Sequence, residues 1–185
     1  MIRLAEEKDV SAAVLLSDAY FGKGYISRNF FKSCLSDPHR IFLVAEFESK
    51  VVGFGLSMIL NTNEDLEASI YLDPRWLRQR LSSYLPVGLR KGTVVDELYR
   101  GRGFGAALIE QSNSILEKRG CKSLVTPVWK STDYDKMASS LTAEGHFPIG
   151  EFREYWKEDS IKRGFQCEKC GHPCQCSMIL YFKAL

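Results

Sequence analysis

The chain has 185 residues, a length that suits one α/β domain with a sizeable core and at most a small appendage. Its 25 Lys and Arg against 23 Asp and Glu give a net charge of +2, too balanced for a protein that binds nucleic acid electrostatically. Residues 1–7 lack the apolar core of a signal peptide, and no apolar run approaches the roughly 18 residues of a membrane span. We therefore expect a soluble, cytoplasmic protein with no membrane partner.

The first third of the chain predicts the order strand, helix, helix, strand, strand. A short strand is expected around residues 2–4, and a helix over 9–20, where apolar residues recur at helical spacing. Ser27 can cap a second helix, which ends before the next proline. The strand-like runs 41–47 and 51–60 are joined by three residues, so a hairpin is the simplest connection.

Residues 61–92 form a long connection, and an unstructured loop of that length would be unusual in a compact domain. A helix is expected within it, with Asp73 as its N-cap and Pro74 in its first position. Its apolar residues lie on one side until Pro86 and Gly88 stop the pattern, and three arginines lie elsewhere on it: Arg75, Arg78 and Arg80.

The stretch around which the chain is organised follows this connection. The β-branched run 93–95 predicts a strand, and residues 106–119 predict an amphipathic helix. Between them, Gly101, Gly103 and Gly105 remove Cβ atoms where a backbone must approach a ligand closely. The free N–H groups in the first turn of the helix point toward the same place, so an anion such as a phosphate would suit this turn.

Two familiar phosphate loops do not fit this turn. The loop of nucleoside triphosphatases needs Lys-Ser/Thr after its last glycine, and the dinucleotide fingerprint needs its third glycine one residue later. The remaining pattern is Arg-x-x-Gly-x-Gly, formed by Arg100, Gly103 and Gly105. It resembles the coenzyme A pyrophosphate loop of the GNAT superfamily of N-acetyltransferases. A glycine-rich turn that only packs a helix against a strand is the alternative.

The resemblance implies the GNAT fold, a mixed central sheet flanked by helices, as a single domain over residues 1–185. It implies transfer of the acetyl group of acetyl-CoA directly to a primary amine of a small molecule or a protein. The backbone of Val95 would polarise the thioester carbonyl, at a splay between the fourth and fifth strands. The residues whose main chain would carry the pyrophosphate are Arg100, Gly101, Arg102, Gly103, Phe104, Gly105 and Ala106.

The acid and base of the reaction are harder to find. The tyrosine that the superfamily usually places on its fourth helix falls here on Leu141 or Thr142. Tyr134, one to two turns earlier, is the candidate acid, and solvent could also protonate the leaving thiolate. Asp96 and Glu97 follow the strand directly and are candidate bases, although carboxylates before a helix commonly stabilise its dipole.

The last third predicts a strand over 123–129 and a helix over 133–144 with Met137, Ala138 and Leu141 facing inward, followed by closing strands over 149–156 and 177–182. A Cys-rich segment over 166–177 lies between the closing strands. Four of the six cysteines crowd into it: Cys167, Cys170, Cys174 and Cys176.

Cys-x2-Cys followed by glycine has the shape of a zinc knuckle, so the pattern predicts a structural Zn²⁺ bound by these four thiolates. His172 could replace one of them. Disulfides, a redox role and an iron–sulfur role are the alternatives. Cys34 and Cys121 are expected to be small buried hydrophobic residues.

The favoured function is therefore an acetyl-CoA-dependent N-acetyltransferase acting on an unidentified amine. A coenzyme A-binding protein of the same fold without catalysis is the first alternative, because the usual helix tyrosine is missing. A protein that uses its Cys-rich knuckle for interaction is the second. The arginine face of the 74–85 helix is either solvated or the lip of an acceptor pocket, and a homodimer is left open.

Overall fold

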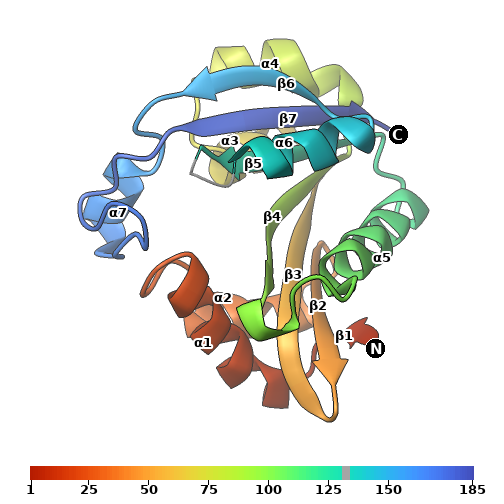
Figure 1. Cartoon of the computed structure of the whole chain (residues 1–185). Helices are drawn as coiled ribbons and strands as arrows, with labels where there is room; N and C mark the ends of the chain where they lie inside the picture. Colours follow the sequence, from red (N-terminus) through yellow and green to blue (C-terminus); the bar gives the residue numbers. More distant parts are fainter. Residues whose placement is uncertain (131–133) are drawn as a thin grey trace.

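The computed structural model describes residues 1–130 and 134–185, with side chains over 1–130 and 137–185. Within these residues, seven strands form one sheet in the order β1-β2-β3-β4-β5-β7-β6 (Figure 1). Every neighbouring pair is antiparallel except β4 and β5, which are parallel. None of the described helices is long and apolar enough to cross a membrane.

The first five elements confirm the predicted order. Ser27 caps the second helix, its Oγ accepting a hydrogen bond of 3.2 Å from the Phe30 N–H. A 3₁₀ turn, Glu7–Asp9, leads into the first helix. The elements are β1 (Ile2–Leu4), α1 (Val10–Tyr20), α2 (Arg28–Ser36), β2 (Arg40–Phe47) and β3 (Lys50–Leu60).

The long connection contains two helices, α3 (Asn63–Ser69) and α4 (Pro74–Leu81). The predicted cap of α4 is confirmed, since Asp73 Oδ1 accepts hydrogen bonds from the N–H groups of the second and third helical residues at 2.9 and 3.1 Å. The sequence prediction missed α3, although Thr62 and Asp65 form a capping box at its start. A 3₁₀ turn, Ser82–Tyr84, ends the helical part where a longer α4 was predicted.

The central strand is longer than the sequence predicted, because β4 (Val87–Val95) begins at Val87 and not at Thr93. Gly88 belongs to the strand because it allows close packing. A Cβ on it would lie 2.7 Å from Leu124 Cδ2 and 3.0 Å from Leu116 Cδ1. β4 has a bulge opposite Leu56 and Ser57, and Lys91 is the extra residue between Arg90 and Gly92.

The sheet opens at its centre. β3 pairs with β4 as far as Val95, whereas β5 (Ser123–Trp129) pairs with β4 only where Val87–Leu89 meet Ser123–Val125. Beyond these residues the two strands separate, so the half sheet β1-β2-β3-β4 diverges from the half sheet β5-β7-β6 (Figure 1). The splay that the resemblance implied is therefore present.

The remaining elements are η3 (Glu97–Tyr99), α5 (Phe104–Lys118), α6 (Tyr134–Ala143), β6 (Phe147–Phe152), α7 (Lys157–Arg163) and β7 (Met178–Ala184). The first closing strand was predicted over residues 149–156, whereas β6 begins two residues earlier and ends at Phe152. Helix α7 was not predicted. Leu141 faces inward as predicted, but Met137 does not, since it is 48% exposed. Asp133, the predicted first residue of the helix that corresponds to α6, lies outside the described residues.

The helices cover the two faces of the sheet unequally. α1 and α2 pack with Phe54 and Leu56 of β3, and α3 and α4 pack with Leu60 on the same side of that strand. α5 packs on the opposite face, with Ile59 in its cluster. α6 contributes Leu141 to a smaller cluster with β5 and β7. The open edge of β4 is therefore accessible from two differently built sides.

Candidate functional site

The glycine-rich turn adopts the backbone that its sequence requires. Gly101 and Gly103 have φ values of +75° and +82°, a left-handed region that other residues enter only at a cost. A Cβ built on either glycine meets no heavy atom within 4 Å. Both glycines therefore border open space, so a ligand could approach the main chain there.

The start of α5 supplies hydrogen-bond donors to that space. The first intrahelical bond runs from the Ala107 N–H to the Gly103 carbonyl at 2.9 Å. The three N–H groups before it, those of Phe104, Gly105 and Ala106, therefore lack the i−4 acceptor of an α-helix. Together with the helix dipole they favour an anion, so the geometry fits a pyrophosphate.

The arginines of the loop have contacts within the protein. Arg100 Nε donates a hydrogen bond of 3.1 Å to the Val95 carbonyl, and its guanidinium lies 4.8 Å from the centre of the Tyr20 ring. The Arg102 guanidinium lies 5.6 Å from the Phe47 ring and 5.4 Å from the Tyr99 ring. Arg100 is thus available to a ligand mainly through its main chain.

Val95 presents its main-chain N–H to the splay. Val95 is paired with Gly53, and the next residue, Asp96, donates its N–H to the Val52 carbonyl at 2.9 Å. In an antiparallel ladder, this pattern makes Val95 and Gly53 a non-hydrogen-bonded pair. The Val95 N–H therefore points away from β3, toward the side on which β5 has separated.

The candidate bases occupy different environments. Asp96 Oδ1 accepts a hydrogen bond of 3.0 Å from the Leu98 N–H and so caps the 3₁₀ turn η3, which is a structural role. Glu97 donates its N–H to Tyr20 Oη at 2.7 Å, while its exposed carboxylate makes no hydrogen bond or ion pair within the part of the chain that the structure describes. Glu97 is the freer of the two carboxylates.

The structure offers no acid at the superfamily's usual position. Leu141 is 3% exposed in the core, and the Thr142 hydroxyl donates a hydrogen bond to the Ala138 carbonyl at 2.9 Å. Tyr134 is the first residue of α6, but its side chain lies outside the described residues.

A cavity of about 280 Å³ lies where β4 and β5 separate, on the face of the sheet that carries α1 to α4. Leu89 and Lys91 of β4 and Pro127 of β5 contribute to its lining. It is close to the lower limit of volume for small-molecule sites. The cavity and the glycine-rich turn thus flank the same strand, one beside its middle and the other beyond its end.

The walls of the cavity are aromatic. The connection between α1 and α2 and the start of α2 contribute Tyr25 and Phe30, the chain after α3 contributes Tyr71, and the segment before α7 contributes Tyr155 and Trp156. Tyr155 Oη accepts a hydrogen bond of 3.1 Å from the Tyr71 N–H, which ties two of these walls together. None of the arginines on α4 lines the cavity; Arg78, for example, pairs with Glu67 at 2.6 Å.

Burial changes the acidity of groups in these walls. It raises the pKa of Tyr25 to about 12 and also raises the pKa of Tyr155. Both phenols therefore keep their protons at neutral pH. Asp159 and Arg163 of α7 form an ion pair, with Arg163 Nε 2.7 Å from Asp159 Oδ1, and this hydrogen bond raises the pKa of Arg163.

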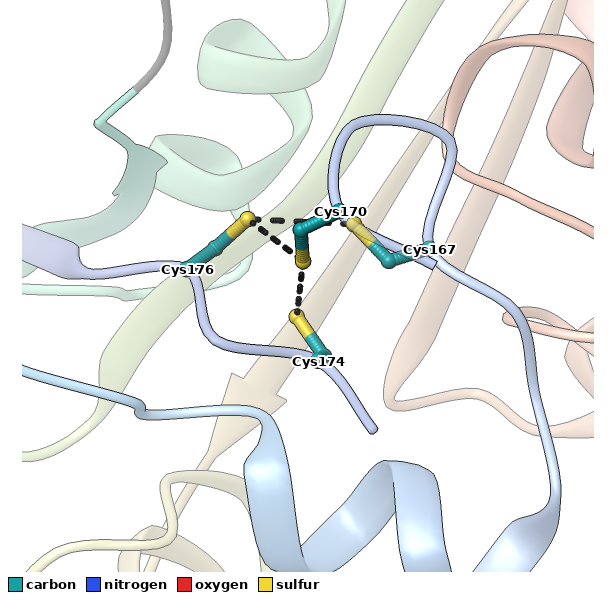
Figure 2. A group of neighbouring side chains, drawn as sticks. All are labelled: Cys167, Cys170, Cys174 and Cys176. Carbon is teal, nitrogen blue, oxygen red and sulfur yellow. Dashed lines mark hydrogen bonds between the residues drawn. The ribbon is translucent and has the colours of Figure 1, made fainter. Parts of the chain in front are cut away.

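The four clustered cysteines point at one another (Figure 2). Their Sγ atoms all lie within 4.8 Å of one another, and the shortest separations are 3.4 Å for Cys170–Cys176 and 3.7 Å for both Cys167–Cys176 and Cys170–Cys174. Four sulfurs held tetrahedrally at about 2.3 Å from a zinc ion lie about 3.8 Å apart. The arrangement therefore fits Zn²⁺, whereas a disulfide would need sulfurs about 2.05 Å apart.

The backbone around the cluster has the hydrogen bonds of a metal knuckle. The Lys169 N–H donates to Cys167 Sγ at 3.4 Å, and the Gln175 N–H donates to Cys170 Sγ at 3.2 Å. Such donors stabilise negative charge on sulfur. His172 lies outside the sulfur group, with Nδ1 3.2 Å from the Phe165 carbonyl oxygen.

The segment 153–177, which we call the strap, connects the cysteine cluster to the cavity. The Cys174 N–H donates to Ser160 Oγ of α7 at 2.8 Å. The strap also holds the α1–α2 connection: the Gln166 N–H donates to the Lys23 carbonyl at 3.1 Å, and Arg163 Nη1 donates to the Tyr25 carbonyl at 2.9 Å. The cluster thus braces two walls of the cavity.

The cavity was not predicted from the sequence. Lys91 was assigned to the connection because β4 was predicted to start late, and Asp159 and Arg163 lie on a helix that was not predicted. Two signals were available. Lys91 immediately precedes Gly92 and the β-branched run, and the acidic start and basic end of α7 suit a helix dipole.

Comparisons with known proteins agree with this architecture at the level of the fold. No family model matches the chain, and no curated protein matches it. Among solved structures, the ribosomal-protein-alanine N-acetyltransferase of Brucella melitensis aligns over 100% of this chain and 99% of its own, with a TM-score of 0.67 and 16% identity. The ribosomal-protein-S18-alanine N-acetyltransferase of Escherichia coli aligns over 100% and 92%, with a TM-score of 0.68 and 17% identity.

A third similar structure holds the cosubstrate. A Bacillus anthracis protein assigned as a streptothricin acetyltransferase, in complex with acetyl coenzyme A, aligns over 100% of this chain and 97% of its own, with a TM-score of 0.63 and 12% identity. The chain therefore has the fold of the GNAT N-acetyltransferases, as its Arg-x-x-Gly-x-Gly turn predicted. At such identities the likeness establishes the fold. Two of these proteins are named for the alanine of a ribosomal protein and the third for streptothricin.

Proposed function

We propose that the protein is an acetyl-CoA-dependent N-acetyltransferase. The observation that carries the proposal is the splay between β4 and β5, with an anion-binding turn beyond the end of β4 and a cavity on one face of the sheet. The main chain of residues 100–106 would bind the pyrophosphate, and the cavity would admit the acceptor amine. The neighbouring folds support this assignment because all three are named as acetyltransferases.

The Val95 N–H is the proposed donor to the thioester carbonyl. As the amine nitrogen bonds to the carbonyl carbon, negative charge develops on the carbonyl oxygen, and an N–H aimed into the splay would stabilise it. The carbon–sulfur bond then breaks, the amine loses a proton to a base, and the thiolate gains one from an acid or from solvent.

We propose Glu97 as the base, because its carboxylate is free among the described residues while that of Asp96 caps a turn. Glu97→Gln should lower kcat about 100-fold, within the usual range for general-base loss, and leave coenzyme A affinity unchanged. An unchanged kcat would exclude Glu97. Tyr134 stays the proposed acid from the sequence.

We propose that Cys167, Cys170, Cys174 and Cys176 hold one structural Zn²⁺. A closed site with four protein ligands leaves no position for a substrate, so its function would be to brace the strap and not to catalyse. The sulfur separations and the N–H donors to sulfur support this proposal.

A coenzyme A-binding protein without catalysis is the second candidate, because Leu141 and Thr142 replace the usual helix tyrosine. Titration with acetyl-CoA, followed by measurement of thiol release with a panel of primary amines, separates the two. We expect binding and amine-dependent thiol release. Binding without turnover of any amine would favour the second candidate, and absence of binding would contradict both. Mass spectrometry of acetylated products in cell extract would then identify the acceptor.

A further inference from the structure

One cationic side chain in the cavity lacks a counter-charge. Lys91 lies at the bulge of β4, between Arg90, which is in register with Ser57, and Gly92, which is in register with Leu56. Lys91 lines the cavity, and its Nζ lies 5.4 Å from the centre of the Phe30 ring. It makes no hydrogen bond or ion pair with any residue that the structure describes.

The carboxylate among the described residues that line the cavity, Asp159, is already paired. Asp159 binds Arg163 through two contacts, Nε–Oδ1 at 2.7 Å and Nη2–Oδ2 at 2.5 Å, and its side chain is only 12% exposed. Burial lowers the pKa of Lys91 and the Arg163 guanidinium lowers it further, while Asp159 acts in the opposite direction. With Lys91 protonated, the described residues of the cavity wall carry two cationic side chains and one carboxylate, an excess of one positive charge.

A partly buried cation without a partner is unfavourable to the free protein. Such a group is typical of a site in which a ligand supplies the missing charge. The aromatic walls would enclose a small organic ligand, and the volume of about 280 Å³ limits it to about the size of an amino acid or a short peptide end. One carboxylate would balance the excess charge.

We propose that the acceptor is a primary amine that also carries a carboxylate, and that Lys91 binds this carboxylate. The inference rests on the proposed acetyl transfer, whose acceptor class it specifies. Lys91 lies on the same strand as Val95, four residues earlier. The carboxylate and the amine would therefore lie along β4, with the amine toward Val95.

The test compares pairs of amines that differ only in the carboxylate. Free amino acids and dipeptides are assayed beside their carboxamides with wild-type protein, Lys91→Met and Lys91→Arg. We expect kcat/KM to favour the carboxylates at least tenfold in the wild type. Lys91→Met should abolish the preference through KM, without changing coenzyme A affinity, and Lys91→Arg should retain part of it. Lys122→Met, at an exposed position before β5, is the matched control and should retain the full preference.

A second measurement separates this inference from the proposed function. Thermal shifts in the presence of coenzyme A report binding without turnover, and carboxylate amines should stabilise the wild type but not Lys91→Met. If they do so while no acetyl group is transferred, the carboxylate site stands and the proposed function fails. Acetylation of carboxamides as efficiently as of carboxylates would overturn the site and leave the function intact. An equal loss of kcat for both members of each pair in Lys91→Met would also overturn the site, because Lys91 would then act on both amines alike and not through the carboxylate.

Discussion

The two sides of the splay are built from different parts of the chain and from different chemical groups. The loop 100–106 uses main-chain N–H groups, and its glycines have no neighbours that a side chain would strike. The strap uses side chains: aromatic rings, an ion pair and four thiols. A site built from backbone suits a ligand part that never varies, whereas a site built from side chains can be specific to one acceptor. Changes in the loop should therefore alter coenzyme A affinity, and changes in the strap should alter use of the acceptor.

Removal of the proposed zinc should have the largest effect of the changes considered, and this effect should be confined to the strap. We expect about one zinc per chain, and chelation under reducing conditions should cost about 3–5 kcal/mol and lower Tm by about 10 °C, because the cluster closes the strap. The acceptor KM should rise about tenfold while the Kd for coenzyme A stays constant. Metal analysis, calorimetry and titration measure the three quantities.

Cysteine variants provide the control for that experiment. Cys170→Ser should lose the zinc, whereas Cys121→Ala, at a buried cysteine outside the cluster, should retain it. Reduced, fully folded wild-type protein without metal would contradict the zinc proposal. A weaker affinity for coenzyme A after chelation would show that the two sides of the splay are not independent.

Gly103→Ala tests the other side of the splay, the loop 100–106. Its Cβ would enter the space beside the α5 N-terminus, and its φ of +82° costs a non-glycine residue about 1–2 kcal/mol. Gly120→Ala is matched, since Gly120 has a φ of +83° and no neighbour within 4 Å but follows the other end of α5. Both variants should lose similar stability, while only Gly103→Ala should weaken coenzyme A binding, by about 10- to 100-fold or 1.4–2.7 kcal/mol. Equal affinities in the two variants would disprove the assigned loop.

The contrast between a loop built from backbone groups and a cavity built from side chains explains which parts of the site could be predicted from the sequence. The loop could be predicted because positive φ values and close approach restrict Gly101 and Gly103 to glycine, which leaves a readable pattern. The four cysteines were visible for a similar reason, since the proposed metal site would fix both residue type and spacing.

The cavity could not be predicted because its residues meet only through tertiary contacts. Lys91, Tyr25 and Tyr155 come from distant parts of the chain, and each of these residue types is common on protein surfaces or in turns. The late start predicted for β4 came from taking Gly88 as a helix stop, whereas its role is to let Leu124 approach. A contact between residues this far apart in the chain cannot be predicted from the order of neighbouring residues.

Gly22→Ala should weaken the contact between the strap and the connection from α1 to α2. A Cβ on Gly22 would lie 1.8 Å from the Gln166 carbonyl oxygen, so the strap must move, at a cost of about 1–3 kcal/mol. Gly24→Ala, in the same connection with φ +81°, would meet nothing closer than Phe165 Cβ at 3.8 Å. We expect a several-fold increase in the acceptor KM for Gly22→Ala, little change for Gly24→Ala, and the same coenzyme A Kd for both by titration. Similar KM values in the two variants would contradict the bracing role of the strap.

The smallest effect should come from a residue that belongs to neither side, His146. It is 2% exposed, and burial lowers its pKa from the ordinary 6.5 to about 4, helped by the Arg90 and Lys183 charges. The nearby carboxylate, Glu144, has Oε2 4.0 Å from His146 Nδ1. Between pH 6.5 and pH 4 the unfolded chain therefore binds a proton that the folded chain excludes. The stabilisation is complete above pH 6.5 and is lost as pH falls toward 4.

From pH 7 to pH 5 this residue should remove about 1–2 kcal/mol of unfolding free energy. Denaturant titrations at the two pH values should show a smaller change in His146→Gln and an unaltered one in His39→Gln, since His39 is exposed. Because His146 stays neutral in the folded protein over this range, it should change neither coenzyme A affinity nor acceptor use by the folded chain. An equal pH slope in His146→Gln would assign the acid sensitivity to another group.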